Sequence, residues 1–197
     1  MMEFLKDLEN VRDHKDVCFL SALGYELTFE TIVLALDKDG VVLRNTIPFS
    51  HVKIMAEKHS FVLQCQKMRI VSSRIQNDGV NIVLPFDSVN VLEENRDEER
   101  FSFRENDDVY VKFVNPFDDE TILTRPILDL SSSGLSFRVI NKSLLFKAQN
   151  RIEKLMVFRD GVCTRTAAGK IVYARNYIDL IGRQYCQVGV HFDKPEE

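Results

Sequence analysis

The chain has 197 residues, of which 45% are hydrophobic and 28% are charged, and its formal net charge is −4. A chain of this length and composition forms either one large globular domain or two domains of about 100 residues each. Proteins that bind nucleic acid usually carry a basic surface, so the acidic balance disfavours nucleic acid as a partner.

The four cysteines lack the spacing of metal ligands, and no apolar run reaches the length of a membrane span. Charged residues stand where a signal peptide would be apolar. We therefore expect a cytoplasmic protein that does not insert into membranes and keeps its thiols reduced. The cysteines are Cys18, Cys65, Cys163 and Cys186.

The first half of the sequence predicts one helix followed by β-structure. Apolar residues recur at helical spacing within 1–16, which indicates an amphipathic helix packed on the core of this half. The turn that begins at Asp37 opens like a calcium-binding loop, but Val42 and Pro48 stand where such a loop needs glycine and a late carboxylate. We expect an N-terminal domain over 1–92 that is mostly β. Its strand-like runs lie at 27–36, 41–43, 61–75 and 80–84.

A linker is predicted at 93–104, where an acidic run leads into Arg100-Phe-Ser-Phe-Arg104. In an extended segment, both arginines share one face and both phenylalanines share the other, toward a core. Arg96 continues the same spacing. Guanidinium groups bind phosphate bidentately and donate to O6 and N7 of guanine, although surface arginines paired with nearby carboxylates are the commoner arrangement.

A second polar motif ends the strand predicted at 121–130. Alternation points Leu128 and Leu130 inward and Asp129 outward. Residues 131–134 (Ser-Ser-Ser-Gly) then form a turn, in which serine commonly bonds its own backbone and glycine supplies a positive φ. A carboxylate and a hydroxyl also match the donors and acceptors of a guanine edge, and glycine lets a ligand approach the backbone closely.

The remaining strands complete a barrel within 105–197. The apolar side chains of 109–113 and 135–139 alternate with polar ones, which is the period expected of a closed antiparallel barrel. Residues 141–149 are expected to form a short helix or a loop, and the tail beyond Phe192 is expected to fray. The predicted strands lie near 101–104, 108–114, 121–130, 134–140, 152–159, 165–175 and 184–192.

Together the two motifs resemble the signature of PilZ domains, the bacterial receptors for cyclic di-GMP (c-di-GMP). In that signature Arg-x-x-x-Arg is followed along the chain by Asp-x-Ser-x-x-Gly. The run Val188-Gly-Val-His-Phe192 also resembles the last barrel strand of the family. The resemblance covers roughly residues 96–194. The matching signature residues are Arg100, Arg104, Asp129, Ser131 and Gly134, with none substituted.

The resemblance also implies the architecture. It implies that 105–197 form a six-stranded antiparallel PilZ barrel, and that 93–104 form a linker that carries the ligand-binding arm. Residues 1–92 resemble, more weakly, the split-barrel-like N-terminal domain of two-domain flagellar-brake proteins. The expected fold is therefore mainly β, with two barrel domains and short helices.

The resemblance implies an effector that binds c-di-GMP through the five signature residues, with Arg96 and Arg138 as auxiliary contacts. The arm is expected to be loose in the free protein and to close over a stacked ligand dimer on the outer face of the barrel. Because the arm is also the linker, closure would reorient the two domains and so regulate a protein target. The flagellar motor, secretion or polysaccharide machinery would be such a target, in motility, biofilm formation or virulence. No cofactor or metal is implied beyond the nucleotide ligand. Many family members carry a basic residue where Glu99 stands, so the ligand stoichiometry stays open.

Two other classes of function stay open. One is a PilZ-like scaffold that binds proteins but no nucleotide, and the intact motif argues against it. The other is a nucleic-acid-binding barrel, which the net charge and the lack of a basic aromatic strip disfavour. The sequence contains no nucleophile elbow, no P-loop and no His-Glu-x-x-His, and His51 and His59 lack neighbours at metal-ligand spacing. We therefore expect no catalysis.

Overall fold

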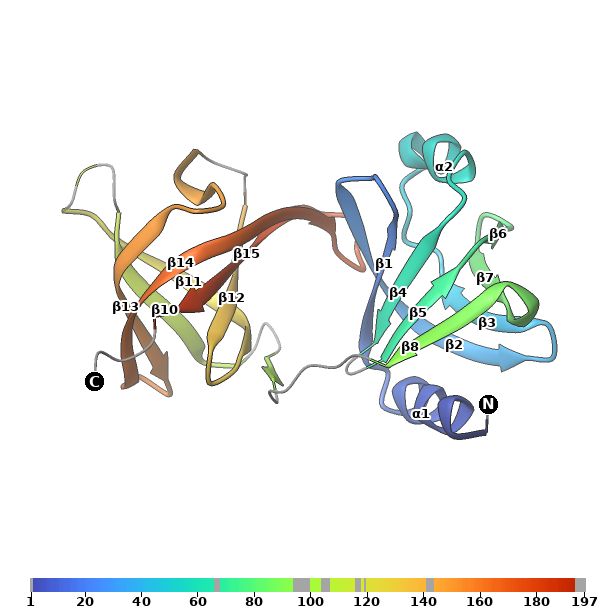
Figure 1. Ribbon diagram of the computed structural model, residues 1–197, viewed down its shortest axis with the longest axis horizontal. Coiled ribbons are helices and arrows are strands. Elements are labelled where there is room, and N and C mark those ends of the chain that lie inside the picture. Colours follow the sequence, from blue (N-terminus) through green and yellow to red (C-terminus); the bar gives the residue numbers. More distant parts are fainter. Residues whose placement is uncertain are drawn as a thin grey trace. The chain divides into compact units, whose positions relative to one another are not determined.

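The computed structural model describes residues 2–65, 68–93, 100–103, 107–115, 118, 120–140 and 144–193. The chain divides into two compact units, each of which is mainly β (Figure 1). Most of the first unit is the N-terminal half, and most of the second is the C-terminal half. A short segment, 177–184, lies inside the predicted barrel range but packs in the first unit. The first unit is Met1–Arg96 with Tyr177–Gln184, and the second is Asp97–Asn176 with Tyr185–Glu197.

The first unit begins with α1 (Met2–Asp13), which confirms the helix predicted from apolar spacing. Leu8 and Val11 of this helix are buried in the core of the unit. The helix ends three residues earlier than predicted. Lys15 has a φ of 52°, and a residue in this left-handed conformation cannot continue an α-helix.

Among the described residues before the linker, eight strands of the first unit pair antiparallel in the order β8-β5-β4-β1-β2-β3-β7-β6. Asp37 pairs with Gly40, so the segment that opens like a calcium loop is a hairpin turn. The alternating stretch 61–75 holds two strands of a hairpin. The strands are β1 (Val17–Ala22), β2 (Leu27–Asp37), β3 (Gly40–Arg44), β4 (Phe61–Cys65), β5 (Met68–Ser72), β6 (Gln76–Asn77), β7 (Asn81–Pro85) and β8 (Val89–Glu93).

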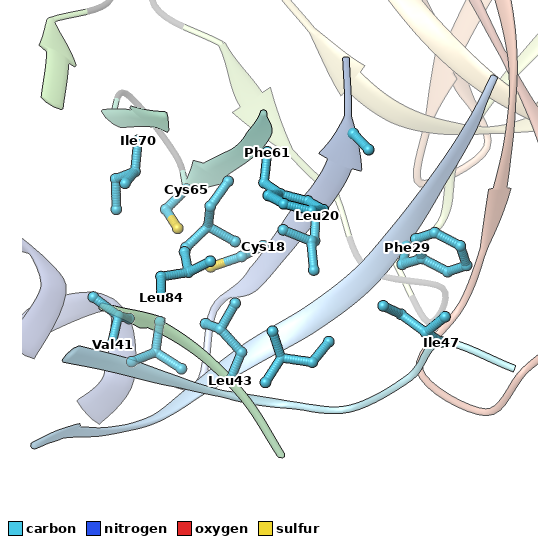
Figure 2. Packing of buried hydrophobic residues seen from close by; sticks show 14 of the residues in the cluster. Cys18, Leu20, Phe29, Val41, Leu43, Ile47, Phe61, Cys65, Ile70 and Leu84 are labelled. Carbon is cyan, nitrogen blue, oxygen red and sulfur yellow. The ribbon is translucent and has the colours of Figure 1, made fainter. Parts of the chain in front are cut away.

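Alternate residues of these strands meet in one apolar core, seen in Figure 2, where Leu20, Leu43, Phe61 and Leu84 approach one another from four strands. A second helix, α2 (Phe49–Ala56), has no counterpart in the sequence prediction. It buries only Met55 completely, and its eight residues are too few to establish a helical period in the sequence. A single 3-10 turn, η1 (Phe86–Ser88), precedes β8. Among the described residues, no helix is both long and apolar enough to cross a bilayer.

The second unit is a closed six-stranded antiparallel barrel, as predicted. Its strands follow one another around the barrel in the order β13-β10-β11-β12-β15-β14, and β14 pairs with β13 to close it. The elements are β9 (Phe101–Ser102), β10 (Val109–Val114), β11 (Ile122–Leu130), β12 (Gly134–Val139), the 3-10 turn η2 (Leu144–Phe146), β13 (Arg151–Arg159), β14 (Val162–Ile178) and β15 (Gln184–Phe192).

Three aromatic rings fill the centre of the barrel. The rings of Phe113 and Phe137 lie 5.4 Å apart between centroids, and Phe146 meets Phe137 edge-on at 5.5 Å. All three side chains are buried. The predicted alternation of apolar residues in β10 and β12 is therefore confirmed, and Phe146 of η2 closes over them.

A β-bulge in β11 changes which residues face the core. Ile127 pairs with Phe137 and Asp129 pairs with Ser136, so Leu128 is the extra residue. The buried residue is Ile127, and Leu128 is only partly buried, contrary to the prediction. Without the bulge, Ile127 and Asp129 would share a face. The bulge turns Asp129 to the outside of the barrel and leaves Leu130 packed against the core.

Candidate ligand-binding site

The arm that carries the first motif lies along β11. Strand β9 pairs with β11 so that Ser102 is opposite Asp129, and the backbone N–H of Phe103 donates to the carbonyl of Leu128 at 2.9 Å. This pairing brings Arg100 to Asp129, where its Nη1 donates to Oδ1 at 3.0 Å. The structure therefore places one residue from each half of the predicted signature in direct contact. The backbone of the described part of the arm, residues 100–103, thus pairs with β11, and the mobility expected of the arm in the free protein stays a prediction.

Asp129 is the centre of a polar cluster on the outer face of the barrel. Its side chain is 17% exposed, and that of Arg100 is 38% exposed. The hydroxyl of Ser136 donates to Oδ2 of Asp129. The Nε2 of Gln187 donates to the Ser136 hydroxyl at 2.9 Å and lies 3.5 Å from Oδ2 of Asp129. Donors from the arm, from β12 and from β15 thus converge on one carboxylate.

Tyr173 covers the cluster from β14. Gly189 pairs with Ser136, and the Tyr173 ring occupies the space that a Cβ at Gly189 would need, only 2.2 Å from its ideal position. Burial raises the pKa of Tyr173, and the nearby Asp129 carboxylate raises it further. Arg100 and a hydrogen bond with Ser136 act in the opposite direction. The phenol therefore stays neutral and belongs to the same hydrogen-bonded group as Asp129.

The turn after Asp129 is stabilised by its own backbone. The N–H of Ser131 donates to the carbonyl of Gly134 at 2.8 Å, and the Ser131 hydroxyl is buried, 3.4 Å from the same carbonyl. Gly134 does not have a positive φ, contrary to the expectation for such a turn. An ideal Cβ at Gly134 would lie 2.3 Å from the carbonyl oxygen of Val190. Glycine is needed here because β12 and β15 approach closely.

Arg138 lies beside the cluster. It pairs with Gln187 across β12 and β15, so the two side chains share the outer face. Its guanidinium stacks on the ring of Tyr185, 4.3 Å from the centroid. On β14, the guanidinium of Arg175 lies 5.1 Å from the centroid of Tyr173. Arginine groups thus approach the Asp129 cluster from the arm, from β12 and from β14.

Two predicted site residues, Arg96 and Arg104, lie outside the described residues, as does Glu99. The prediction that both phenylalanines of the arm enter the core is half right. Phe103 packs against the barrel core, whereas Phe101 is 60% exposed. The β9 strand is only two residues long and pairs with β11 alone, so nothing on its other side covers Phe101 among the described residues.

Sequence reasoning missed Ser136, Gln187, Tyr173 and Arg175. Ser136 was within reach, because Leu135 and Phe137 point inward and so the serine between them points outward. Gly189 was a second signal, since glycine inside a strand often marks a close approach by another group. Nothing in the sequence links Tyr173 to Gly189. Within the described ranges, no group of three or more His, Cys, Asp or Glu side chains gathers as metal ligands would.

Comparison with solved structures identifies proteins of the same fold. The chain aligns over 99% of its length with MrkH of K. pneumonia in complex with c-di-GMP, at a TM-score of 0.71 and 13% sequence identity, covering 87% of that chain. It also aligns over 99% of its length with YcgR of Escherichia coli in complex with c-di-GMP, at a TM-score of 0.56 and 13% identity, covering 83% of that chain.

A second MrkH structure, described as a c-di-GMP dependence transcription regulatory factor, aligns at a TM-score of 0.61 and 13% identity, covering 99% of this chain and 84% of that one. No family model matches the sequence, and no curated protein matches it either. The chain therefore has the mainly β fold, with a closed six-stranded barrel, of the PilZ-domain proteins MrkH and YcgR.

Proposed function

We propose that this protein is a PilZ-type receptor for c-di-GMP and that the ligand binds on the outer face of the barrel around Asp129. One observation carries the proposal. The Arg100 guanidinium and the Asp129 carboxylate, which come from motifs far apart in the sequence, meet at 3.0 Å on that face. Two proteins of the same fold, MrkH and YcgR, have been solved in complex with this nucleotide, which supports the choice of ligand.

The side chains fit the chemistry of the ligand. The N1–H and N2–H groups of guanine are donors that suit a carboxylate, while O6, N7 and the phosphates are acceptors that suit guanidinium groups. Asp129 supplies the carboxylate, and Arg100 and Arg138 supply guanidinium groups on the same face. The ligand contacts predicted for Arg104, Ser131 and Gly134 and the auxiliary contact of Arg96 stay predictions.

Ligand binding requires an exchange of partners in this proposal. Arg100 occupies Oδ1 of Asp129, so a guanine donor must replace it there, and Arg100 then becomes available for the guanine acceptors or the phosphates. Arginine pairs well with phosphate, so the guanidinium loses one anion and gains another. Because 93–104 also joins the two units, a new arm conformation changes their relative orientation and regulates a protein target.

Isothermal titration calorimetry with c-di-GMP tests the proposal. Wild type is expected to bind, and Arg100→Ala, Arg104→Ala and Asp129→Asn are each expected to weaken binding by about tenfold or more, since a charge-assisted hydrogen bond contributes roughly 1.5–3 kcal/mol. Arg74→Ala is the matched control, because Arg74 also pairs with an exposed aspartate, Asp87, in the first unit. Its affinity is expected to equal that of wild type.

Titration with GTP, single-stranded RNA and duplex DNA separates the alternatives. DNA is included because one protein of this fold is described as a transcription regulatory factor. Binding of RNA or DNA without any binding of c-di-GMP would overturn the proposal. Absence of binding by every nucleotide and nucleic acid would favour a scaffold that works through protein contacts alone.

A further inference from the structure

The two oxygens of Asp129 have different surroundings. Oδ2 receives its donors from the barrel itself, from Ser136 on β12 and Gln187 on β15. Oδ1 receives its donor from the arm, through Arg100. Barrel strands are fixed by pairing on both sides, whereas the arm is attached to the barrel through the two-residue strand β9. The donors to Oδ2 therefore belong to the fixed barrel strands, whereas the donor to Oδ1 belongs to the arm and can move away.

Gln187 is itself confined by its neighbours. Its Nε2 donates a hydrogen bond to the hydroxyl of Ser136. Its neighbours on the same face of β15 are Tyr185 and Gly189, and other side chains cover both of them. On one side Arg138 lies over the ring of Tyr185, and on the other the Tyr173 ring fills the space above Gly189. These contacts restrict the rotamers of the carboxamide, so its donor N–H stays directed at Ser136 and Asp129.

We propose that Gln187 is a positioning residue of the ligand site: together with Ser136 it holds Oδ2 of Asp129 on the barrel, so that the carboxylate presents Oδ1 to the donor edge of guanine once Arg100 leaves. This inference rests on the proposed function. Guanine offers N–H donors at N1 and N2, while adenine offers an acceptor at N1 and no amino group at C2. A carboxylate oxygen that is fixed in this position accepts hydrogen bonds from the guanine donors and repels the N1 acceptor of adenine.

The first test measures discrimination between bases. Dissociation constants for c-di-GMP and cyclic di-AMP are determined by calorimetry for wild type and Gln187→Leu, which has a similar size but no donor. Selectivity is the dissociation constant of cyclic di-AMP divided by that of c-di-GMP. This ratio is expected to fall by about tenfold or more in the variant, because Asp129 loses a charge-assisted hydrogen bond and can rotate. A merely structural role would lower the unfolding midpoint without changing this ratio.

The second test uses Gln187→Glu, which keeps the shape of the side chain and places a second carboxylate beside Oδ2. The charged or titratable groups around this position are Asp129 on β11, Arg100 on the arm, Arg138 on β12, Tyr173 and Arg175 on β14, and Tyr185 on β15. Two adjacent carboxylates repel, so the pair takes up a proton as the pH falls. Binding of c-di-GMP by Gln187→Glu is expected to be weaker by about tenfold or more near pH 8 and to recover partly near pH 6.

The matched control is Gln76→Glu, which makes the same charge change at an exposed residue of the first unit. Its affinity is expected to stay within about twofold of wild type at both pH values. If circular dichroism shows that Gln187→Leu is unfolded, the pH dependence of c-di-GMP binding by Gln187→Glu is the test of the inference. If wild type fails to bind c-di-GMP, the proposed function falls and this inference falls with it. If wild type binds but the Gln187 variants keep the base ratio and the pH profile of wild type, the inference alone is overturned.

Discussion

At the scale of single residues, the glycine of the Asp-x-Ser-x-x-Gly motif is explained by strand packing. A Cβ on Gly134 would lie 2.3 Å from the backbone oxygen of Val190, and a backbone atom cannot swing aside as a side chain can. We expect Gly134→Ala to lower the free energy of unfolding by about 2–3 kcal/mol, because β12 and β15 must separate. Urea denaturation measures this. Ser132→Ala, at an exposed position of the same turn, should change stability by less than about 0.5 kcal/mol. Equal stabilities of the two variants would contradict the packing explanation.

Tyr173 gives a second prediction at this scale. Burial raises its pKa, with the Asp129 carboxylate adding to the effect, so the folded protein holds the phenolic proton more tightly than the unfolded chain does. The resulting stabilisation is complete below the ordinary pKa of tyrosine, about 10, and is lost as the pH rises through the folded value. Spectrophotometric titration of tyrosinate should show a component that ionises late. That component should vanish in Tyr173→Phe and in denaturant. A late component that survives in Tyr173→Phe would assign it to another tyrosine.

At the scale of secondary-structure elements, the bulge in β11 decides what the second motif can do. It changes the alternation at Leu128, so Ile127 enters the barrel core while Asp129 faces outward beside Ser136. In a regular strand Ile127 and Asp129 would lie on the same face, so either the carboxylate would be buried or Ile127 would be exposed. Because of the bulge, one strand can place Ile127 in the core and the Asp129 carboxylate on the outer face.

The strands also determine which thiols can react. Cys18 and Cys65 are buried in the first core and Cys186 in the second, whereas Cys163 of β14 is exposed. A hydrogen bond with Cys18, together with burial, raises the pKa of the Cys65 thiol, which disfavours the reactive thiolate. We expect Ellman's reagent to modify one thiol quickly in native protein and the other three only after unfolding. Native Cys163→Ser should show no fast reaction, and a remaining fast thiol would contradict this assignment.

At the scale of the whole molecule, the first unit is completed by a segment from the far end of the chain. Residues 177–184 belong to this unit, and Ile178 is buried in its core. The backbone N–H of Leu180 donates to the carboxylate of Glu30 on β2 at 3.3 Å. The side chain of Asp179 stabilises the turn between β14 and β15 by accepting from the backbone N–H groups of Ile181 and Arg183. Folding of the first unit therefore depends on the last residues of β14 and on those that follow them.

This dependence gives a prediction for two isoleucines in the same segment. Ile178 is 3% exposed and Ile181 is 71% exposed. We expect Ile178→Ala to lower the free energy of unfolding by about 2–5 kcal/mol, through lost burial and the cavity that it leaves. Ile181→Ala should change it by less than about 0.5 kcal/mol. Urea unfolding followed by circular dichroism compares them, and a stable Ile178→Ala would show that the segment adds little to the first core.

The sequence by itself predicted the mainly β composition, the helix within 1–16, most strands of the barrel, and the two motifs around Arg100 and Asp129. These features depend on local alternation and on residue chemistry, which can be read along the chain. The short helix α2 was not predicted because a helix of eight residues is too short for its apolar residues to show a helical period.

Only the tertiary structure decided which side chains join the site. Ser136, Gln187 and Tyr173 reach Asp129 from three strands whose order around the barrel is not written in their spacing along the chain. The bulge at Leu128, the reason for Gly134 and the placement of 177–184 in the first unit likewise depend on pairing between distant segments. Alternation within a strand indicates which of its faces is buried, but it does not say which distant strand becomes its neighbour.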